Sequence, residues 1–422
     1  MEENKNQFSN IDINKEEPEE QDEYAGMDVI SADSGDHFIA ITVSEPQKIG
    51  EGISSYLAYT IYTKTNIPQY TLTNSETQKR FSDFLALHAL LTSRYLRAGR
   101  IIPSVPSKNL IGTTKVKMSP QQSDSNSGSG MEWIEIRRAA LERFLNRTAQ
   151  HRVLRVDPDF INFLQTDKEL PGAINTSTLS GAGVMRLFNK FGETVNKITY
   201  KMDENDPWFD DKITEIESFD ACIQHLHSTI KSLVNNRKEL ALFTGLVSKA
   251  AALLSTCEEH TGLSRALSSL ADIEEKIEIL RSEQSNSDFF ILAEYLKEYI
   301  GLFDAIKAVF HERVKVFQNW QHAQMQLTKR RETKSKLEVS GKNDRSDQMQ
   351  KEIEEWEVKV QRCQQEFDEI SAVIKEELNN FNRIRVDDFK AVIKKYFENQ
   401  MAHQQQLVKY WEAFIPATKE IF

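Results

Sequence analysis

The chain has 422 residues and a formal net charge of −11, with 28% charged and 39% hydrophobic residues. This length predicts two or three domains, while the mean hydropathy of −0.52 argues against a single large core. No uninterrupted apolar run reaches the about 20 residues of a membrane-spanning helix, and the acidic N-terminus has no apolar segment typical of a secretion signal. Three scattered cysteines argue against a disulfide framework and a zinc site, so we expect a cytoplasmic protein.

The net charge is unevenly distributed along the chain. Residues 1–35 carry 11 acids and 2 bases, residues 36–165 carry 11 acids and 16 bases, and the remainder is again acidic. Because salt screens charges over about 10 Å, the basic segment can face an anionic surface although the whole chain is acidic. The first segment is predicted to be a disordered acidic tail, which either solubilises the protein or recruits a partner.

Strands are predicted at the start of the basic segment. Residues 38–43 alternate apolar side chains with a period of two, and residues 56–63 are rich in aromatic and β-branched types. A third strand is expected at 69–73. We therefore predict a small three-stranded sheet within an α+β domain that spans residues 36–166.

Three helices are expected in the same domain. The apolar spacing changes to three and four from residue 83, and Ser82 is the expected N-cap of this first helix. A second helix is predicted at about 131–148, after a loop rich in serine and glycine, and a third near 158–165.

The rest of the chain is predicted to be all-α. Residues 167–202 form a linker, and Gly262 and Gly341 divide residues 203–422 into three very long helices. The apolar residues of these helices recur at spacings of three and four, which is typical of a coiled-coil seam. A helix of about 70 residues would be about 105 Å long. Its apolar stripe therefore needs an antiparallel bundle and a second chain to cover it.

Basic, hydroxyl and aromatic side chains gather around the start of the first helix. Arg80 carries a planar fork suited to a phosphate, and Ser82 adds a hydroxyl at a helix N-terminus. Phe81 offers a flat apolar wall, and Lys108 adds a point charge on a proline-containing loop. With Arg137 of the second helix, this set suits a phosphorylated cyclic polyol. Taken singly, each residue also fits a plain surface turn, a loop or an SH3 ligand.

The same residues carry a resemblance to a known family. Lys79–Phe84 (KRFSDF) and the Pro103-x-x-Pro106-x-Lys108 loop resemble the phox-homology (PX) domain. Later stretches resemble PX-BAR sorting nexins of the sorting nexin-1 and sorting nexin-2 type: 179–183, 235–242, 263–267 and 409–414. The resemblance implies a PX domain at 36–166, a linker with an amphipathic helix at about 182–201, and a three-helix BAR domain at 203–422.

The resemblance also implies a role for each residue of the cleft. Arg80 matches the arginine that binds the 3-phosphate of phosphatidylinositol 3-phosphate, assisted by the hydroxyl of Ser82. Phe81 matches the aromatic residue under the inositol ring, and Lys108 matches the lysine that meets the 1-phosphate. Arg137 matches the arginine that contacts the far hydroxyls, with Arg138 as the alternative.

The linker contains a basic amphipathic pattern. Its apolar residues share one helical face: Val184, Leu187, Phe188, Phe191 and Val195. Arg186 and Lys190 lie among the basic residues of the other face. This pattern favours a helix that lies in the membrane interface, and the resemblance implies a wedge. The alternative is that the apolar face packs on the PX domain or on the bundle.

A second basic cluster lies at the end of the second long helix, at Lys329, Arg330, Arg331, Lys334 and Lys336. Residues 329–351 hold 8 bases and 4 acids. Each basic residue near an anionic membrane contributes about 1 kcal/mol to binding. The cluster is therefore a candidate membrane contact, and the alternative is a solvated helix tip.

The resemblance implies a non-catalytic peripheral membrane protein without cofactor, catalytic residue or metal site. It would bind phosphatidylinositol 3-phosphate on early endosomes, sense or induce curvature, and form tubules for retromer-linked retrograde cargo sorting. Its partners would be the phosphoinositide membrane, retromer, and a second BAR domain in a homodimer or a heterodimer with a sorting nexin of the type 5 and 6 group, and no nucleic acid. An enzyme is disfavoured because the sequence has no phosphate loop, kinase set or nucleophile elbow. A coiled-coil trafficking scaffold with an inactive lipid cleft is the alternative.

Overall fold

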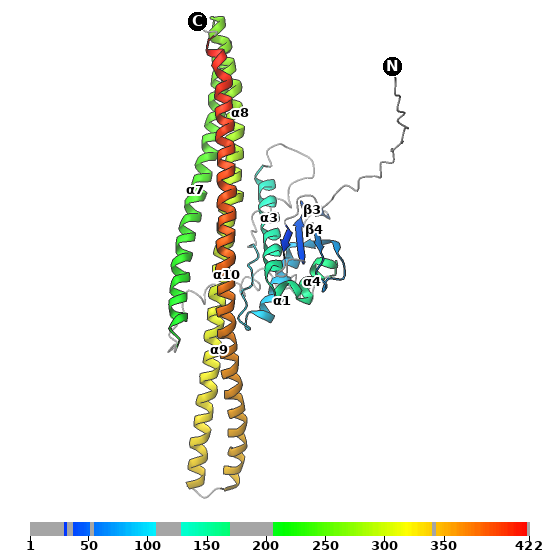
Figure 1. Cartoon of the computed structure of the whole chain (residues 1–422), viewed down its shortest axis with the longest axis vertical. Coiled ribbons are helices and arrows are strands. Elements are labelled where there is room, and N and C mark those ends of the chain that lie inside the picture. The colour runs from blue at the N-terminus through cyan, green and yellow to red at the C-terminus, as the bar shows by residue number, and fades with distance from the viewer. Residues whose placement is uncertain are drawn as a thin grey trace, which may run out of the picture.

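The computed structural model describes residues 29–31, 37–50, 55–106, 128–168, 206–339 and 343–419. A small α/β domain lies against the side of a long rod of helices, near the middle of its length (Figure 1). The last helix ends at one tip of the rod, and it begins at the other tip, beside the end of the helix before it (Figure 1).

The sheet of the small domain is antiparallel and has five strands: β1 (Val29–Ser31), β2 (Phe38–Val43), β3 (Gln47–Ile49), β4 (Tyr56–Thr65) and β5 (Asn74–Arg80). The long strand β4 pairs with β5 along one edge and with β2 and β3 along the other. The expected strands at 38–43 and 56–63 are confirmed. Strand β1 pairs with β2 inside the segment predicted to be disordered, so that prediction is wrong for these three residues.

The described sheet has five strands and not the three predicted, and the strand expected at 69–73 is wrong, because β5 occupies 74–80 instead. Alternate residues of β5 point inward, but they are polar: Ser75, Thr77 and Lys79 are all buried. Ser75 and Lys79 donate hydrogen bonds to backbone carbonyls at the end of the last helix of the domain, at 2.9 and 2.5 Å. A strand whose buried face is satisfied in this way has no apolar alternation for a sequence pattern to detect.

Within its described residues the domain has three α-helices, α1 (Phe81–Tyr95), α3 (Gly128–Gln150) and α4 (Pro158–Gln165), and a 3₁₀ turn, η2 (Leu154–Val156). The second and third predicted helices are confirmed. Ser82 is not the N-cap of α1, because β5 runs directly into the helix and Arg80 is the cap. The carboxylate of Asp83 accepts the backbone N–H of Arg80 at 2.9 Å, as in a capping box.

The rod consists of α7 (Pro207–Cys257), α8 (Thr261–Asp288), a single π-helical turn η3 (Phe289–Ala293), α9 (Glu294–Val339) and α10 (Asn343–Lys419). The predicted breaks near Gly262 and Gly341 are confirmed. Helix α7 packs along α8 in the half of the rod that holds the C-terminus, while α9 packs along α10 in the other half (Figure 1). The predicted second helix comprises α8, η3 and α9.

Helix α7 has an apolar segment that the sequence patterns did not single out. By length and composition alone, this helix is long and apolar enough to cross a membrane. Its most apolar stretch has a mean hydropathy of 1.6, and 28% of that stretch is buried. Large exposed apolar residues gather in the C-terminal half of the helix, between Leu240 and Leu254. This is a surface feature of the rod and bears on how the rod assembles.

Stability of the small domain is expected to depend on pH through His88 of α1, whose ring lies 6.3 Å from that of Phe144. Burial lowers the pKa of the His88 imidazole from 6.5 to about 4. Between pH 6.5 and 4, His88 is therefore protonated in the unfolded chain but stays neutral in the folded domain. The stabilisation is complete above pH 6.5 and is lost as the pH falls towards 4, by at most about 3 kcal/mol.

We expect the midpoint temperature of thermal unfolding, followed by circular dichroism, to decrease as the pH is lowered from 6.5 to 4. His88→Gln should flatten this fall. The same pH dependence in the variant and the wild type would contradict the assignment to His88.

Candidate functional site

The junction between β5 and α1 positions Arg80. Its backbone N–H and its side chain are both tied to Asp83, with Arg80 Nε 3.3 Å from Asp83 Oδ1. The guanidinium lies 5.9 Å from the ring centroid of Tyr56 on β4, and 38% of the side chain is exposed. Arg80 is thus oriented from two sides while part of its planar fork reaches the surface.

Beside Arg80, a buried arginine is held between two aromatic rings. The guanidinium carbon of Arg137 lies 4.3 Å from the ring centroid of Phe81 and 3.9 Å from that of Trp133. Only 7% of Arg137 is exposed, and its Nη2 has no hydrogen-bond partner among the described residues. The buried hydroxyl of Tyr59 forms no hydrogen bond of good geometry there, although it lies near enough to Arg137 to interact with its charge.

Burial without a carboxylate makes this position electrostatically unusual. Burial lowers the pKa of the Arg137 guanidinium, and it raises the pKa of the Tyr59 hydroxyl against the opposing effect of Arg137. A buried donor without an acceptor costs free energy, so such groups occur where a ligand supplies the acceptor. This group of side chains is therefore suited to a ligand that has both anionic and hydroxyl oxygens.

The structure distinguishes Arg137 from its alternative, Arg138. Arg138 binds Glu135 and Glu142 at 2.6 and 2.8 Å and donates to the carbonyl of Val43 at 2.7 Å, so it is fully engaged inside the domain. The sequence contained this signal, because acids stand three residues before and four after Arg138 but at neither spacing from Arg137.

The other predicted cleft residues are placed differently. The hydroxyl of Ser82, in the first turn of α1, lies 3.3 Å from Asp83 Oδ1. Lys108 lies outside the described residues. Lys79 is directed away from the cleft towards the end of α4, and burial lowers the pKa of its amine. Sequence reasoning missed Tyr56, Tyr59 and Trp133, although Trp133 stands one helical turn before Arg137.

The basic cluster near the end of α9 is partly used within the rod. Arg330 binds Glu352 at 3.1 Å and faces the ring of Trp356, and Arg331 binds Glu357 at 2.7 Å. Lys334 contacts Gln350 at 2.8 Å. These contacts join α9 to α10, whereas Lys329 and Lys336 are exposed. The seven linker residues predicted to contact membrane, from Val184 to Val195, lie outside the described residues.

Comparison with known proteins agrees with this architecture. The PX domain family model matches residues 68–167, and the model described as Vps5 C terminal like matches residues 184–417. The cryo-EM structure of the SNX-BAR Mvp1 tetramer aligns with a TM-score of 0.53 and 15% identity, over 88% of this chain and 100% of that chain, which shows similarity of fold.

Curated relatives are much closer in sequence. Sorting nexin-2 of Bos taurus and of Homo sapiens are each 46% identical over 389 residues, 92% of this chain and 74% of the relative. Sorting nexin-1 of Rattus norvegicus is 44% identical over 383 residues, 91% of this chain and 72% of the relative. The expected order of a PX domain and a long helical region is confirmed. The chain belongs to the PX-BAR sorting nexins, a family of non-catalytic, membrane-binding trafficking proteins.

Proposed function

We propose that this sorting nexin binds phosphatidylinositol 3-phosphate through the cleft between β5, α1 and α3, at the cytoplasmic face of early endosomes. The observation that carries the proposal is Arg137, a buried cation between two rings whose Nη2 has no acceptor among the described residues. The Arg80 guanidinium lies over the ring of Tyr56 and the Arg137 guanidinium over the ring of Phe81, so each cation is held against an aromatic ring.

Each side chain of the cleft would have a separate role in headgroup binding. Arg80 would bind the 3-phosphate, Phe81 would lie under the inositol ring, and Arg137 would donate to the far hydroxyls. Ser82 would assist Arg80, and Lys108 would meet the 1-phosphate. Two arginines and an aromatic ring suit a headgroup that carries both phosphate and hydroxyl oxygens.

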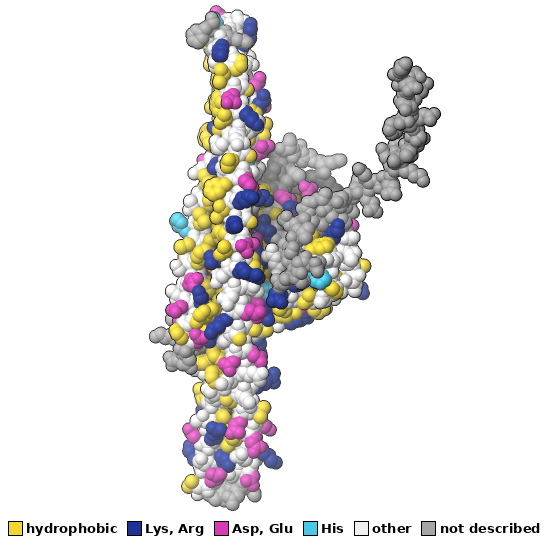
Figure 2. Space-filling model, in the orientation of Figure 1, with side chains coloured by type: hydrophobic (Ala, Val, Ile, Leu, Met, Phe, Trp, Pro, Cys, Tyr) yellow, Lys and Arg dark blue, Asp and Glu magenta, His cyan; other side chains and the backbone are white. Residues whose placement is uncertain are grey.

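We propose that a second BAR domain covers the apolar surface of the rod, from another copy of this chain or from a sorting nexin of the type 5 and 6 group. Figure 2 shows hydrophobic side chains along the half of the rod that ends at the C-terminus. In the C-terminal half of α10 the large exposed apolar residues fall in one stripe: Val386, Ile393, Phe397, Met401, Val408, Trp411 and Ile415. The stripe is about 45 Å long, and α7 also carries exposed Leu, Phe and Val side chains in the same half of the rod. An apolar surface of this size is typical of an interface.

We propose that the dimer combines three weak membrane contacts, which act together through avidity. These are the headgroup cleft, the amphipathic segment at 182–201, and the basic cluster near the end of α9. A rigid rod that presents them together would favour tubular endosomal membrane and could work with retromer in retrograde sorting. A coiled-coil scaffold with an inactive cleft is the second candidate, and the exposed coiled-coil stripe of α10 alone would suit it.

The test of headgroup binding is co-sedimentation of the wild type and Arg80→Ala with small and large liposomes, with and without phosphatidylinositol 3-phosphate. We expect the variant to lose at least about tenfold in affinity, because one charge-assisted contact to phosphate contributes about 1.5–3 kcal/mol. Wild-type binding that is equal with and without phosphatidylinositol 3-phosphate, or unchanged binding of the variant, would leave the scaffold as the better proposal.

The amphipathic segment should act after recruitment. Phe188→Glu places a charge on the apolar face, so we expect it to reduce tubulation of giant vesicles at least about fivefold while co-sedimentation changes less than about twofold. Equal loss of both activities would contradict a wedge and indicate that this face packs inside the protein.

A further inference from the structure

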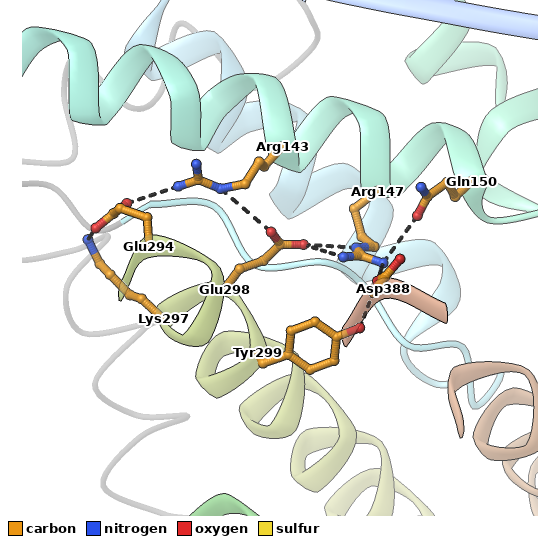
Figure 3. Close-up of polar contacts among 8 residues, drawn as sticks. All are labelled: Arg143, Arg147, Gln150, Glu294, Lys297, Glu298, Tyr299 and Asp388. Atoms are coloured by element: carbon orange, nitrogen blue, oxygen red, sulfur yellow. Dashed lines mark hydrogen bonds and ion pairs between the residues drawn. The ribbon is translucent and has the colours of Figure 1, made fainter. Parts of the chain in front are cut away.

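Helix α3 reaches both the cleft and the rod. Arg137 lies between Phe81 and Trp133. Arg143 and Arg147, one turn apart on the same helix, face the rod (Figure 3). The rise of an α-helix separates Arg137 from Arg143 by only about 9 Å along the axis. Contacts that fix the second part of α3 on the rod therefore also fix the position of Arg137.

The contacts of these two arginines form a continuous network. Arg143 Nη2 lies 2.9 Å from Glu294 Oε2, and its Nε lies 3.5 Å from Glu298 Oε2. Arg147 Nη2 lies 2.7 Å from Glu298 Oε1, and its Nη1 lies 2.5 Å from Asp388 Oδ2. One arginine pair of the PX domain thus bridges two carboxylates of α9 and one of α10 (Figure 3).

The network is largely shielded from water. Glu294 is 3% exposed, and Arg147 and Glu298 are 15% and 16% exposed. Burial opposes the charge of Arg147, yet the carboxylates of Glu298 and Asp388 raise the pKa of its guanidinium. The hydroxyl of Tyr299 donates to Asp388 at 2.7 Å and fixes that carboxylate. Ion pairs in such a setting are costly to break one partner at a time.

The network just described is the first of two seats, which are contact regions between the PX domain and the rod. The second seat lies just after the C-terminal end of α1. Glu377 of α10 accepts hydrogen bonds from Arg100 Nη1 at 2.7 Å and from the backbone N–H of Ile101 at 3.2 Å, and it lies 2.9 Å from the ring of His151. Gly99, with φ +82°, approaches Ile370 so closely that a Cβ would lie 3.0 Å from its side chain. The backbone turn at Gly99 therefore depends on glycine.

The apolar contacts of this second seat belong to the core of the rod. Leu96 and Ile101 of the PX domain are nearly buried in one cluster with Ile370 and Ile374 of α10. Ser104 then lies against Gly301 of α9, where a Cβ would come within 2.1 Å of the serine hydroxyl. Both chain segments that lead to headgroup residues, α3 and the loop after α1, are therefore seated on the rod.

We propose that these two seats form a junction lock, which holds the headgroup cleft at one fixed orientation to the long axis of the rod. The proposal rests on the proposed headgroup binding only for its consequence on membranes. A PX domain on a free tether would let the rod meet the membrane at any angle. A locked PX domain presents the rod in one orientation, so the headgroup and rod contacts form together at a high effective concentration.

The test uses two double variants, one that removes the charged residues of the PX domain from the junction and one that removes those of the rod. Arg143→Ala/Arg147→Ala changes α3, and Glu298→Ala/Asp388→Ala changes only the rod and cannot damage the PX domain directly. Arg383→Ala is the matched control, since it removes an exposed arginine of α10 that bonds to Asn380 on its own helix.

The orientation of the domains is measured with electron-spin distances in full-length protein diluted with unlabelled chains. One label is placed at Glu45→Cys in the PX domain and the other at the native Cys222 of α7, in a Cys257→Ser/Cys363→Ser background. We expect a narrow distance distribution in the wild type and in the control, and a broad one in both double variants. A distribution that stays narrow in both double variants would overturn the lock.

Two binding measurements separate the lock from the cleft. Affinity for soluble inositol 1,3-bisphosphate should change less than about twofold in the rod-side variant, because that variant leaves the cleft intact. Its binding to small phosphatidylcholine vesicles with phosphatidylinositol 3-phosphate should fall about tenfold and lose its preference over large vesicles. An unchanged preference for small vesicles would contradict the consequence. If the wild type does not bind inositol 1,3-bisphosphate, the proposed function fails. The distance measurement still tests whether the junction lock exists.

Discussion

Arg137→Met is expected to stabilise the PX domain and to remove most of its affinity for the headgroup. Methionine fills the same slot between Phe81 and Trp133 and makes favourable contacts with their rings. It also removes a buried charge whose Nη2 has no acceptor among the described residues, which should raise the free energy of unfolding by about 1–2 kcal/mol. The loss of one charge-assisted hydrogen bond should weaken headgroup binding by about 10–100-fold.

The matched control is the neighbouring residue. Arg138→Met breaks ion pairs to Glu135 and Glu142 and the contact with the carbonyl of Val43, so it should destabilise the domain and leave headgroup affinity nearly unchanged. Chemical denaturation and calorimetric titration with inositol 1,3-bisphosphate measure the two effects separately. If Arg137→Met destabilises the domain, or binds the headgroup as the wild type does, Arg137 has a structural role and the cleft assignment fails.

Trp133 should act through Arg137 without touching the headgroup. Trp133→Ala removes one of the two rings that hold the guanidinium, so the side chain gains rotamer freedom that binding must then restrict. We expect affinity to fall about tenfold, with recovery in Trp133→Phe. This rescue would not occur if the tryptophan bound the ligand through its indole N–H.

The sequence was sufficient for elements with strong periodicity and insufficient where polar residues are buried. The long helices and their breaks could be predicted because their apolar spacing continues over many turns. Strand β5 could not, since Ser75, Thr77 and Lys79 fill its inward face. The motif around Arg80 was found from chain neighbours. Trp133 and Tyr59 were missed because their relation to Arg137 arises only when α3 packs against the sheet.

The junction between the domains was beyond any sequence pattern. Arg147 and Asp388 are 241 residues apart, and Arg100 and Glu377 are 277 residues apart. Charged residues on long helices are usually solvated, so nothing in the local sequence marks Glu298 or Glu377 as a buried partner. The π-helical turn η3 precedes Glu294 and turns the following helix by an amount that periodicity cannot show.

A single charge in the apolar stripe of α10 is expected to dissociate the proposed dimer. Phe397 is 59% exposed in the single chain, so Phe397→Glu should cost the isolated rod little. In a dimer the same position would be covered, and an unpaired carboxylate would have to leave water. We expect the dimer affinity to fall at least about 100-fold, since loss of a large interface residue with burial of a charge exceeds about 3 kcal/mol.

Lys395→Glu is a stringent control, because Lys395 is exposed on another face of α10 and its change in charge is larger. Sedimentation velocity over a range of concentrations measures assembly, and circular dichroism verifies that helix content is retained. A variant that remains dimeric would contradict the placement of the interface on this stripe. A wild type that is monomeric throughout would instead favour a different sorting nexin as the second chain, and Phe397→Glu should then prevent that heterodimer. Either result separates assembly from headgroup binding, because the stripe and the cleft share no residue.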